Sequence, residues 1–277
     1  MEIYQGIILG ILQGLTEFLP VSSSGHLVLG QLYLGIKESM LSFDISVHMG
    51  TLAAVLVVYF SDIRTMVRSM AGFTVRLLRR QPAFHLLKED PNLKMAWLII
   101  IGSVPTALIG LALKKVEHIL FTSSLIVGFM LILTGTVLWV SRHFYHDPGA
   151  HDSRFDAKRA LFIGIIQGLA VIPGISRSGS TIAAGMFAGF DRSMAAKFSF
   201  LLSIPAILGA QILSIKETLN TTGLSIDPVT VCGTIASFLT GLGALTLLLK
   251  LVHRGKFHLF APYCWLAGTL ALAANLI

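Results

Sequence analysis

The fold of this chain is indicated by one stretch, Gln13-Gly-Leu-Thr-Glu17-Phe-Leu-Pro20-Val-Ser-Ser-Ser-Gly-His26. Before Pro20 the residues are those of an apolar helix, and after it come three serines, a glycine and a histidine. Because proline lacks the backbone N–H and clashes with the preceding turn, it kinks or breaks a helix, and we expect the helix to break there. Polar side chains in apolar surroundings are costly to bury and indicate a functional site. This stretch is therefore treated as one part of a site.

The composition is that of a protein embedded in a membrane. The chain has 277 residues, of which 54% are hydrophobic and 13% charged, whereas soluble domains carry about 25% charged residues. A helix of roughly 20 apolar residues crosses a bilayer. Six such segments are predicted, at residues 43–60, 95–113, 121–141, 198–215, 229–252 and 259–277, with a basic loop at 61–94. We expect one integral membrane domain over residues 1–277.

Two further pairs of apolar segments are too short to span with ease. Residues 3–19 and 27–36 flank the polar turn after Pro20, and residues 160–172 and 182–190 flank a second turn that begins at Pro173. Irregular backbone is tolerated at membrane depth only where it is buried in protein or lines a wet cavity. Each pair is predicted to be a re-entrant helix–loop–helix unit.

The two units are copies of one pattern. Gly10-Ile-Leu-Gln-Gly-Leu15 aligns with Gly164-Ile-Ile-Gln-Gly-Leu169, and without a gap two of the following serines and a glycine also match. At the remaining positions Glu17 faces Val171, Ser23 faces Arg177 and His26 faces Ser180. The copies therefore share a scaffold and carry different chemical groups.

The order of the predicted spans gives the copies opposite orientations. Three spans separate the units, so the units enter the membrane from opposite faces. The fold class is thus an all-α polytopic membrane protein with six transmembrane helices plus two re-entrant helix–loop–helix units in an inverted-topology repeat. The repeats cover about residues 1–145 and 155–277. In such proteins sites are built near the midplane, where the repeats meet.

The distribution of positive charge orients the chain. With both termini outside, sixteen of the 21 Lys and Arg residues fall in the inside segments 61–94, 142–160, 191–197 and 250–258. This asymmetry follows the positive-inside rule. The net charge of +7 is explained by loops that meet anionic lipid head groups, and no nucleic acid partner is expected.

The two turns carry complementary chemistry. Ser23, His26 and Glu17 offer a hydroxyl, an imidazole and a carboxylate, which can serve as a nucleophile, a base and an orienting group. Arg177 is the one cation outside the loops and their ends, and the fork of a guanidinium suits phosphate oxygens. Together these groups indicate phosphoryl chemistry at membrane depth.

Structural roles compete with these assignments. Glu17 and Arg177 could form an ion pair that holds the fold, and Gln13 could bond between helices. The hydroxyls of Ser22, Ser24 and Thr181 suit helix caps. Asp44 and His48, four residues apart at the start of a span, are expected to cap that helix or to line the entrance to the site.

Residues 13–26 resemble the Glu/Gln-x-x-x-Glu motif and serine–histidine loop of bacterial undecaprenyl-diphosphate phosphatases, the bacitracin-resistance family. Pro173-Gly-Ile-Ser-Arg-Ser-Gly-Ser-Thr181 resembles that family's second motif, and Lys197-Phe-Ser-Phe-Leu-Leu-Ser-Ile-Pro205 is also similar. Gln13 takes the glutamine option of the first motif, which leaves one carboxylate instead of two. The resemblance covers essentially the whole chain.

The resemblance implies an enzyme that hydrolyses undecaprenyl diphosphate to the monophosphate carrier reused in cell-wall synthesis. It implies that Arg177 clamps the diphosphate and that Ser176 and Thr181 donate hydrogen bonds to it. The same resemblance gives Ser23 and His26 the reaction itself, with Glu17 and Gln13 positioning the nucleophile or a cation, and Ser22 is placed with the substrate-binding residues. Either His26 attacks phosphorus, or Ser23 attacks with His26 as its base. Both alternatives stay open.

The implied partners are a polyprenyl diphosphate and membrane lipids, in the plasma membrane of a bacterium. Mg²⁺ or Ca²⁺ is an expected cofactor with Glu17 as ligand, since hard cations prefer oxygen. The glycine stripes suit intramolecular packing and a homodimer equally. A transporter or flippase for a phosphorylated lipid or anion is the alternative function, because inverted repeats with broken helices are also a transporter plan.

Overall fold

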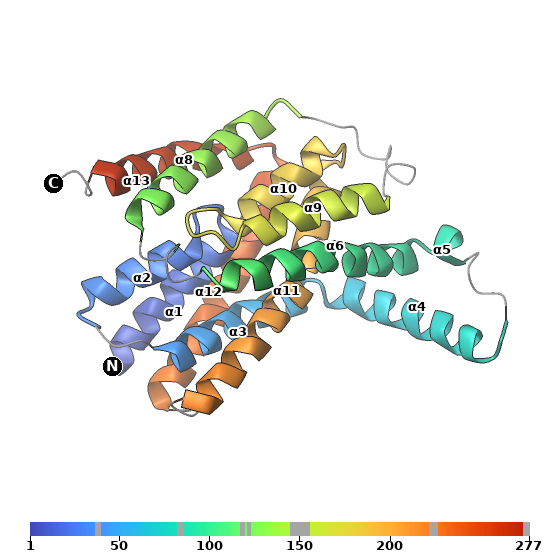
Figure 1. Cartoon of the computed structure of the whole chain (residues 1–277), viewed down its shortest axis with the longest axis horizontal. Coiled ribbons are helices and arrows are strands. Elements are labelled where there is room, and N and C mark those ends of the chain that lie inside the picture. Colours follow the sequence, from blue (N-terminus) through green and yellow to red (C-terminus); the bar gives the residue numbers. More distant parts are fainter. Residues whose placement is uncertain are drawn as a thin grey trace.

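The computed structural model describes residues 1–36, 40–81, 86–116, 120, 123–144, 156–221 and 227–273, and the regular structure in these ranges is helical (Figure 1). Within them, five helices are long and apolar enough to cross a membrane. They are α3 (Leu41–Val58), α6 (Pro91–Lys114), α8 (Ser124–Ser141), α11 (Arg192–Thr221) and α12 (Pro228–His253). These five match five of the six predicted spans, and the chain is a polytopic membrane protein.

The segment predicted as the sixth span is a shorter helical unit. It begins with the 3₁₀ turn η1 (Phe257–Phe260) and continues as α13 (Ala261–Ala273), which lies alongside α8 at one edge of the molecule (Figure 1). The prediction extended to Ile277, and residues 274–277 lie outside the described part of the chain. Its crossing of the membrane stays a prediction.

The segment 61–94 was expected to be a basic loop, and this expectation is wrong for most of its length. Helix α4 (Phe60–Leu78) directly follows α3, and the short helix α5 (Leu86–Glu89) precedes α6. The physical reason lies in one face of α4, where Met66 and Phe73 are buried. The ring of Phe73 meets Trp97 of α6 edge-on with centroids 6.0 Å apart. Burial of this apolar face against α6 stabilises α4 as a helix, although the segment is rich in arginine.

The two short helix pairs are present and break near Pro20 and Pro173 as predicted, but their second helices begin at Ser23 and Arg177, earlier than the expected starts at residues 27 and 182. Helix α1 (Ile3–Phe18) is followed by α2 (Ser23–Tyr33), and α9 (Ala157–Leu169) is followed by α10 (Arg177–Phe187). In the first turn Ser22 has a φ of 68°, and in the second Gly174 has a φ of 92°. Both turns therefore pass through left-handed backbone, which costs a serine more than a glycine.

Each first helix of a pair packs closely on a span from the other half of the chain. Helix α1 lies along α12, and α9 lies along α6. A Cβ placed on Gly10 would be 2.2 Å from the carbonyl oxygen of Gly233, and one on Gly164 would be 2.0 Å from that of Gly102. The glycines that align in the sequence therefore make equivalent backbone contacts, as expected for small-residue helix packing.

The main apolar core lies next to the two turns. Phe18, at the end of α1, meets Phe200 of α11 with ring centroids 5.9 Å apart, and the ring of Tyr59 stacks on Phe200 with centroids 6.2 Å apart. Phe18 and Phe200 are almost completely buried. This packing fixes the end of α1 and thereby the position of Glu17, one residue earlier.

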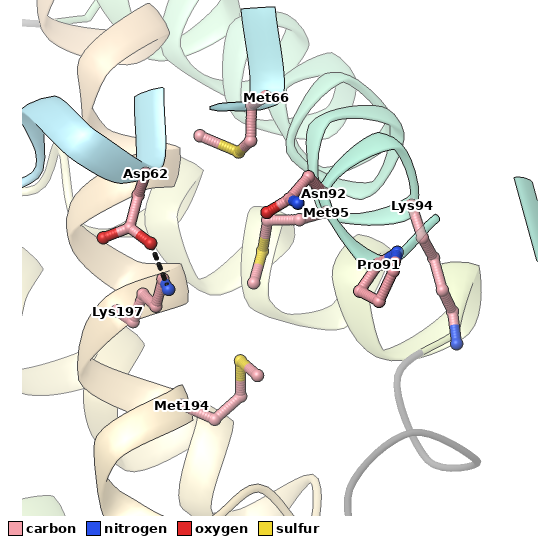
Figure 2. Close-up of a pocket in the computed structure, with 8 residues that line it drawn as sticks. All are labelled: Asp62, Met66, Pro91, Asn92, Lys94, Met95, Met194 and Lys197. Carbon is pink, nitrogen blue, oxygen red and sulfur yellow. Dashed lines mark ion pairs between the residues drawn. The ribbon is translucent and has the colours of Figure 1, made fainter. Parts of the chain in front are cut away.

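A small cavity of about 120 Å³ lies apart from the two turns, between α4, α6 and α11 (Figure 2). Met66, Met95 and Met194 line it together with an ion pair between Lys197 and Asp62. The pair ties α4 to α11. None of the residues predicted from the two turns lines this cavity.

Candidate active site

The first half of the site is built at the end of α1. Gln13 and Glu17 lie one helical turn apart on the same face, so both side chains point to the same place. Gln13 Nε2 donates a hydrogen bond of 2.9 Å to Glu17 Oε2, and Ser23 Oγ at the start of α2 donates one of 2.6 Å to the same oxygen. Gln13 is completely buried and Glu17 is 8% exposed. Gln13 and Ser23 thus both donate to the same carboxylate oxygen of Glu17 and form one hydrogen-bond network with it.

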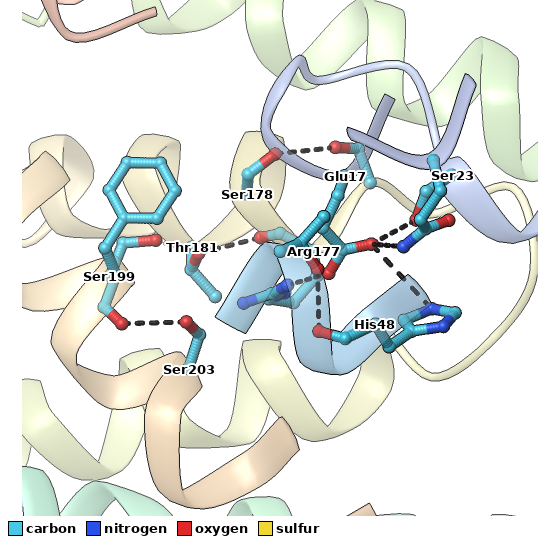
Figure 3. A network of polar contacts seen from close by, with 12 residues as sticks. Glu17, Ser23, His48, Arg177, Ser178, Thr181, Ser199 and Ser203 are labelled. Carbon is cyan, nitrogen blue, oxygen red and sulfur yellow. Dashed lines mark hydrogen bonds and ion pairs between the residues drawn. The ribbon is translucent and has the colours of Figure 1, made fainter. Parts of the chain in front are cut away.

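The second half arrives with the first residue of α10. Arg177 donates to Glu17 Oε1 and forms an ion pair with it, as Figure 3 shows. A second link joins the turns themselves, because the backbone N–H of Gly174 donates to Ser22 Oγ over 3.2 Å. The two copies of the pattern therefore meet, with the carboxylate from one and the guanidinium from the other.

His48 of α3 also faces this carboxylate. Its Nε2 lies 3.9 Å from Glu17 Oε2, and its Nδ1 lies 2.7 Å from the backbone oxygen of Asp44 (Figure 3). The Asp44 carboxylate accepts a 2.7 Å hydrogen bond from Gln31 of α2. The sequence offered a signal for this residue in the spacing of Asp44 and His48, but it gave no reason to place His48 beside Glu17.

His26 lies in the first turn of helix α2, and its ring makes a separate set of contacts. Its Nδ1 is 2.9 Å from the backbone oxygen of Ser22, and its Nε2 is hydrogen-bonded to the hydroxyl of Tyr263 on α13. The two rings stack with centroids 5.7 Å apart and an angle of 23°. Both ring nitrogens of His26 thus have partners outside the Glu17 network. Tyr263 was not singled out from the sequence.

The polar residues around Arg177 are engaged within the protein. Ser176 caps α10 by accepting a 3.1 Å hydrogen bond from Gly179 N. Thr181 is completely buried, and its hydroxyl bonds to the backbone oxygen of Arg177 at 2.7 Å and to Ser199 of α11 (Figure 3). These hydroxyls hold the turn that presents the guanidinium. Their contacts with a substrate, like that of Ser22, stay predictions.

The charges of the site set what it can bind. The Glu17 carboxylate is balanced by the Arg177 guanidinium and has His48 beside it, so an anion can bind by taking over contacts of the guanidinium. Within the described ranges no group of three His, Cys, Asp or Glu side chains could hold a metal ion. Among the described residues, Oε1 of Gln13 is buried without a hydrogen-bond partner, as is Oε1 of Gln167, the aligned residue of the second copy. Glu17 and Gln13 are therefore the residues that could contribute oxygen ligands to a cation, with the others supplied by substrate and water.

An all-helical polytopic membrane protein that brings a serine and a partly buried arginine to one buried carboxylate between two broken helices has the features of a membrane-embedded enzyme for a phosphorylated lipid. Comparison with known proteins agrees with this class. The chain belongs to the bacitracin resistance protein BacA family, whose model matches residues 6–270.

Curated relatives match this chain along its whole length. An undecaprenyl-diphosphatase of Desulforapulum autotrophicum is 54% identical over 100% of both chains. One of Desulfosudis oleivorans is 52% identical over 98% of both chains. A relative of the same name from Methanosphaera stadtmanae is 40% identical over 100% of this chain and 99% of its own. The similarity is therefore not confined to the two motifs.

Proposed function

We propose that this protein is an undecaprenyl-diphosphatase, which hydrolyses undecaprenyl diphosphate to undecaprenyl phosphate and inorganic phosphate. The observation that carries the proposal is the meeting of Arg177 and Ser23 on one carboxylate, Glu17. This arrangement places the Arg177 guanidinium, which can bind an anion, near the Ser23 hydroxyl, whose proton is already directed at Glu17. Full-length relatives at 52% and 54% identity support the same activity.

The substrate competes with Glu17 for the arginine. The fork of Arg177 presents several N–H donors to a diphosphate, and phosphate oxygens pair with it in a bidentate manner. As the guanidinium turns to the phosphate, Glu17 loses part of its cationic neighbour and becomes a stronger proton acceptor. Ser23, which donates to Glu17 over 2.6 Å, is thereby activated only when substrate is present.

Ser23 Oγ then attacks the terminal phosphorus. The new bond joins this oxygen to phosphorus, the bond from that phosphorus to the bridging oxygen breaks, and the proton passes to Glu17. Undecaprenyl phosphate leaves with the bridging oxygen. Arg177 and the loop donors stabilise the charge on the transferred group. The contact between Ser23 and Glu17 favours this route over direct attack by His26.

Water completes the cycle. It attacks the phosphorus of the phosphoserine and gives its proton to Nε2 of His26, the bond from phosphorus to Ser23 Oγ breaks, and the serine recovers its proton from Glu17. Inorganic phosphate leaves, and His26 releases its proton to the phosphate or to solvent. In this route His26 serves as the general base for the second half of the reaction.

A divalent cation, Mg²⁺ or Ca²⁺, is proposed as a partner of the bound diphosphate. Glu17 and the unpartnered Oε1 of Gln13 would hold it on the protein side. When bound, such an ion neutralises charge on the phosphate oxygens. Phosphate release in the presence of a chelator, and after Mg²⁺ or Ca²⁺ is restored, tests this requirement.

The architecture proposed for this activity is the inverted-topology repeat of about residues 1–145 and 155–277, with α13 as the sixth span and the two helix pairs re-entrant. The matching contacts of Gly10 with Gly233 and of Gly164 with Gly102 support it. So does Figure 1, where α1 begins and α13 ends at one end of the molecule while the arginine-rich α4 lies at the other. The site would then lie inside the plasma membrane of a bacterium, with both termini extracytoplasmic. A homodimer is compatible with the glycine stripes.

The test is direct hydrolysis. Purified protein in detergent is incubated with undecaprenyl diphosphate or a farnesyl diphosphate, with and without Mg²⁺ or Ca²⁺, and released phosphate is measured. We expect release that Arg177→Ala abolishes and Arg68→Ala, a change in an exposed arginine of α4, leaves unchanged. If no phosphate is released under any of these conditions, the proposed phosphatase activity is wrong. The alternative function, a flippase or transporter, then remains.

A further inference from the structure

The C-terminal helix holds the first loop at two adjacent residues. Tyr263 of α13 bonds to His26 Nε2, and the thiol of the next residue, Cys264, donates to the backbone oxygen of Pro20 over 3.2 Å. Cys264 is completely buried, whereas Tyr263 is 45% exposed. Helix α13 thus contacts the turn through the buried Cys264 and contacts His26 through the partly exposed Tyr263.

The contacts of His26 define its tautomer. A backbone carbonyl oxygen can only accept, so the nitrogen beside the carbonyl of Ser22, Nδ1, carries the proton. In the neutral ring Nε2 therefore carries the lone pair. The hydroxyl of Tyr263 lies at this nitrogen and donates to it. The same ring nitrogen that would take a proton from water is thus occupied by a tyrosine hydroxyl.

We propose that Tyr263 is a positioning residue for the reaction, which holds the His26 ring in the tautomer with a basic Nε2 and covers that nitrogen until substrate arrives. This inference rests on the proposed function only for its consequence in catalysis. The contact itself makes a chemical prediction: Nε2 of His26 is less reactive toward electrophiles than the same nitrogen of a histidine without such a partner.

Acylation by diethyl pyrocarbonate tests the contact without any assay of phosphatase activity. The reagent acylates unprotonated imidazole nitrogen, and its rate at each histidine is followed by peptide mass spectrometry in the full-length protein. We expect Tyr263→Phe to raise the rate at His26 about fivefold, the effect of losing one hydrogen bond. Phenylalanine keeps the stacked ring, so the variant isolates the hydroxyl. Unchanged acylation of His26 would overturn the proposal.

Two further variants sharpen the measurement. Tyr33→Phe removes the hydroxyl of a tyrosine that is 92% exposed on the same helix as His26, and we expect it to leave the rate at His26 unchanged. Tyr263→Trp restores an N–H donor at the exposed position and should bring the rate back toward that of the wild type. It also decides the matter if Tyr263→Phe does not fold, because fast acylation in a folded Tyr263→Trp protein would contradict the proposal.

The catalytic consequence is measured separately. In Tyr263→Phe we expect kcat to fall about tenfold with KM little changed, since the tyrosine acts on the histidine and not on substrate binding. A rise in KM at constant kcat would show a role in binding and would overturn the positioning role. If the wild-type protein releases no phosphate, the proposed function fails, while the acylation rates still decide whether Tyr263 covers His26.

Discussion

Arg177 donates a hydrogen bond to Glu17 across 160 residues of sequence, and together with the bond from Gly174 to Ser22 this contact joins the two helix breaks. The arginine side chain is 19% exposed and the glutamate side chain 6%. Such a buried pair is poor evidence for a stabilising role, because the cost of removing both charges from water offsets their attraction. The pair is better explained by function: it holds the guanidinium of Arg177 where it can bind an anion.

Arg177→Lys should therefore fold and lose activity. Lysine keeps the positive charge beside Glu17 but lacks the planar fork that pairs with two phosphate oxygens. We expect phosphate release to fall about 10²–10³-fold, the usual effect of losing a transition-state donor. The measurement is kcat for an isoprenyl diphosphate in detergent, with Arg68→Lys as the matched control. Activity of Arg177→Lys close to wild type would contradict the role of the fork.

Ser23→Ala should abolish turnover and the phosphorylated intermediate together. Rapid quenching of the wild-type enzyme, followed by peptide mass spectrometry, is expected to place phosphate on Ser23. Ser46→Ala is the control, since that hydroxyl bonds to the backbone of Ser42 in its own helix. Phosphate found on His26 instead would assign the attack to the imidazole.

His48→Gln should lower kcat about tenfold and leave the fold intact. The imidazole lies 3.9 Å from the carboxylate that accepts the proton of Ser23, so it is placed to share that proton until Glu17 returns it to the serine. Glutamine keeps a polar side chain but cannot take up a proton. His253→Gln, at an exposed position on α12, is the control. Equal kcat values for the two variants would remove His48 from the mechanism.

Gly10→Ala and Gly164→Ala should destabilise the protein by similar amounts. The new methyl groups would lie 2.2 Å and 2.0 Å from backbone oxygens of the facing helices, and overpacking of this kind costs about 1–3 kcal/mol. The melting temperature in detergent measures the effect. Gly243→Ala, where no atom lies within 4 Å, is expected to be neutral or slightly stabilising. A loss at only one of the two glycines would weaken the proposed repeat.

Asp227 should make stability depend on pH. The backbone N–H of Thr230 donates to its carboxylate at the start of α12 and lowers the pKa of Asp227. A lowered pKa means that this stabilisation is complete above the unfolded value, about 3.9, and is lost as the pH falls through the folded value. Asp227→Asn keeps a cap without a charge and should lose that acid dependence. Asp227→Ala should cost about 1 kcal/mol at neutral pH.

Much of the fold was open to prediction from the sequence, because apolar length and helix-breaking residues act locally. Five spans and both helix breaks follow from such patterns. The segment 61–94 did not, since its overall polarity hides the buried face around Met66 and Phe73. A mean over the segment cannot distinguish a loop from a helix that packs on one side.

The candidate site likewise has a part that the sequence predicts and a part that it does not. The internal repeat predicted that the two turns would meet near the middle of the fold, and the sequence offered an ion pair between Glu17 and Arg177 as a structural alternative, which the two residues do form. His48 and Tyr263 enter from α3 and α13, and their contacts depend on how distant helices pack. No spacing in the sequence encodes those contacts. The position of His26 relative to a bound phosphate stays a prediction, since both its ring nitrogens face other partners.

The packing of α1 on α12 also has a consequence for how the protein is made. About 210 residues separate the end of α1 at Phe18 from the start of α12 at Pro228. At 5–20 residues per second the ribosome needs roughly 10–40 s to supply that partner. During this interval α1 is already in the membrane with its glycine face uncovered. The glycine face of α1 therefore stays without its partner until α12, in the last fifth of the chain, has been synthesised.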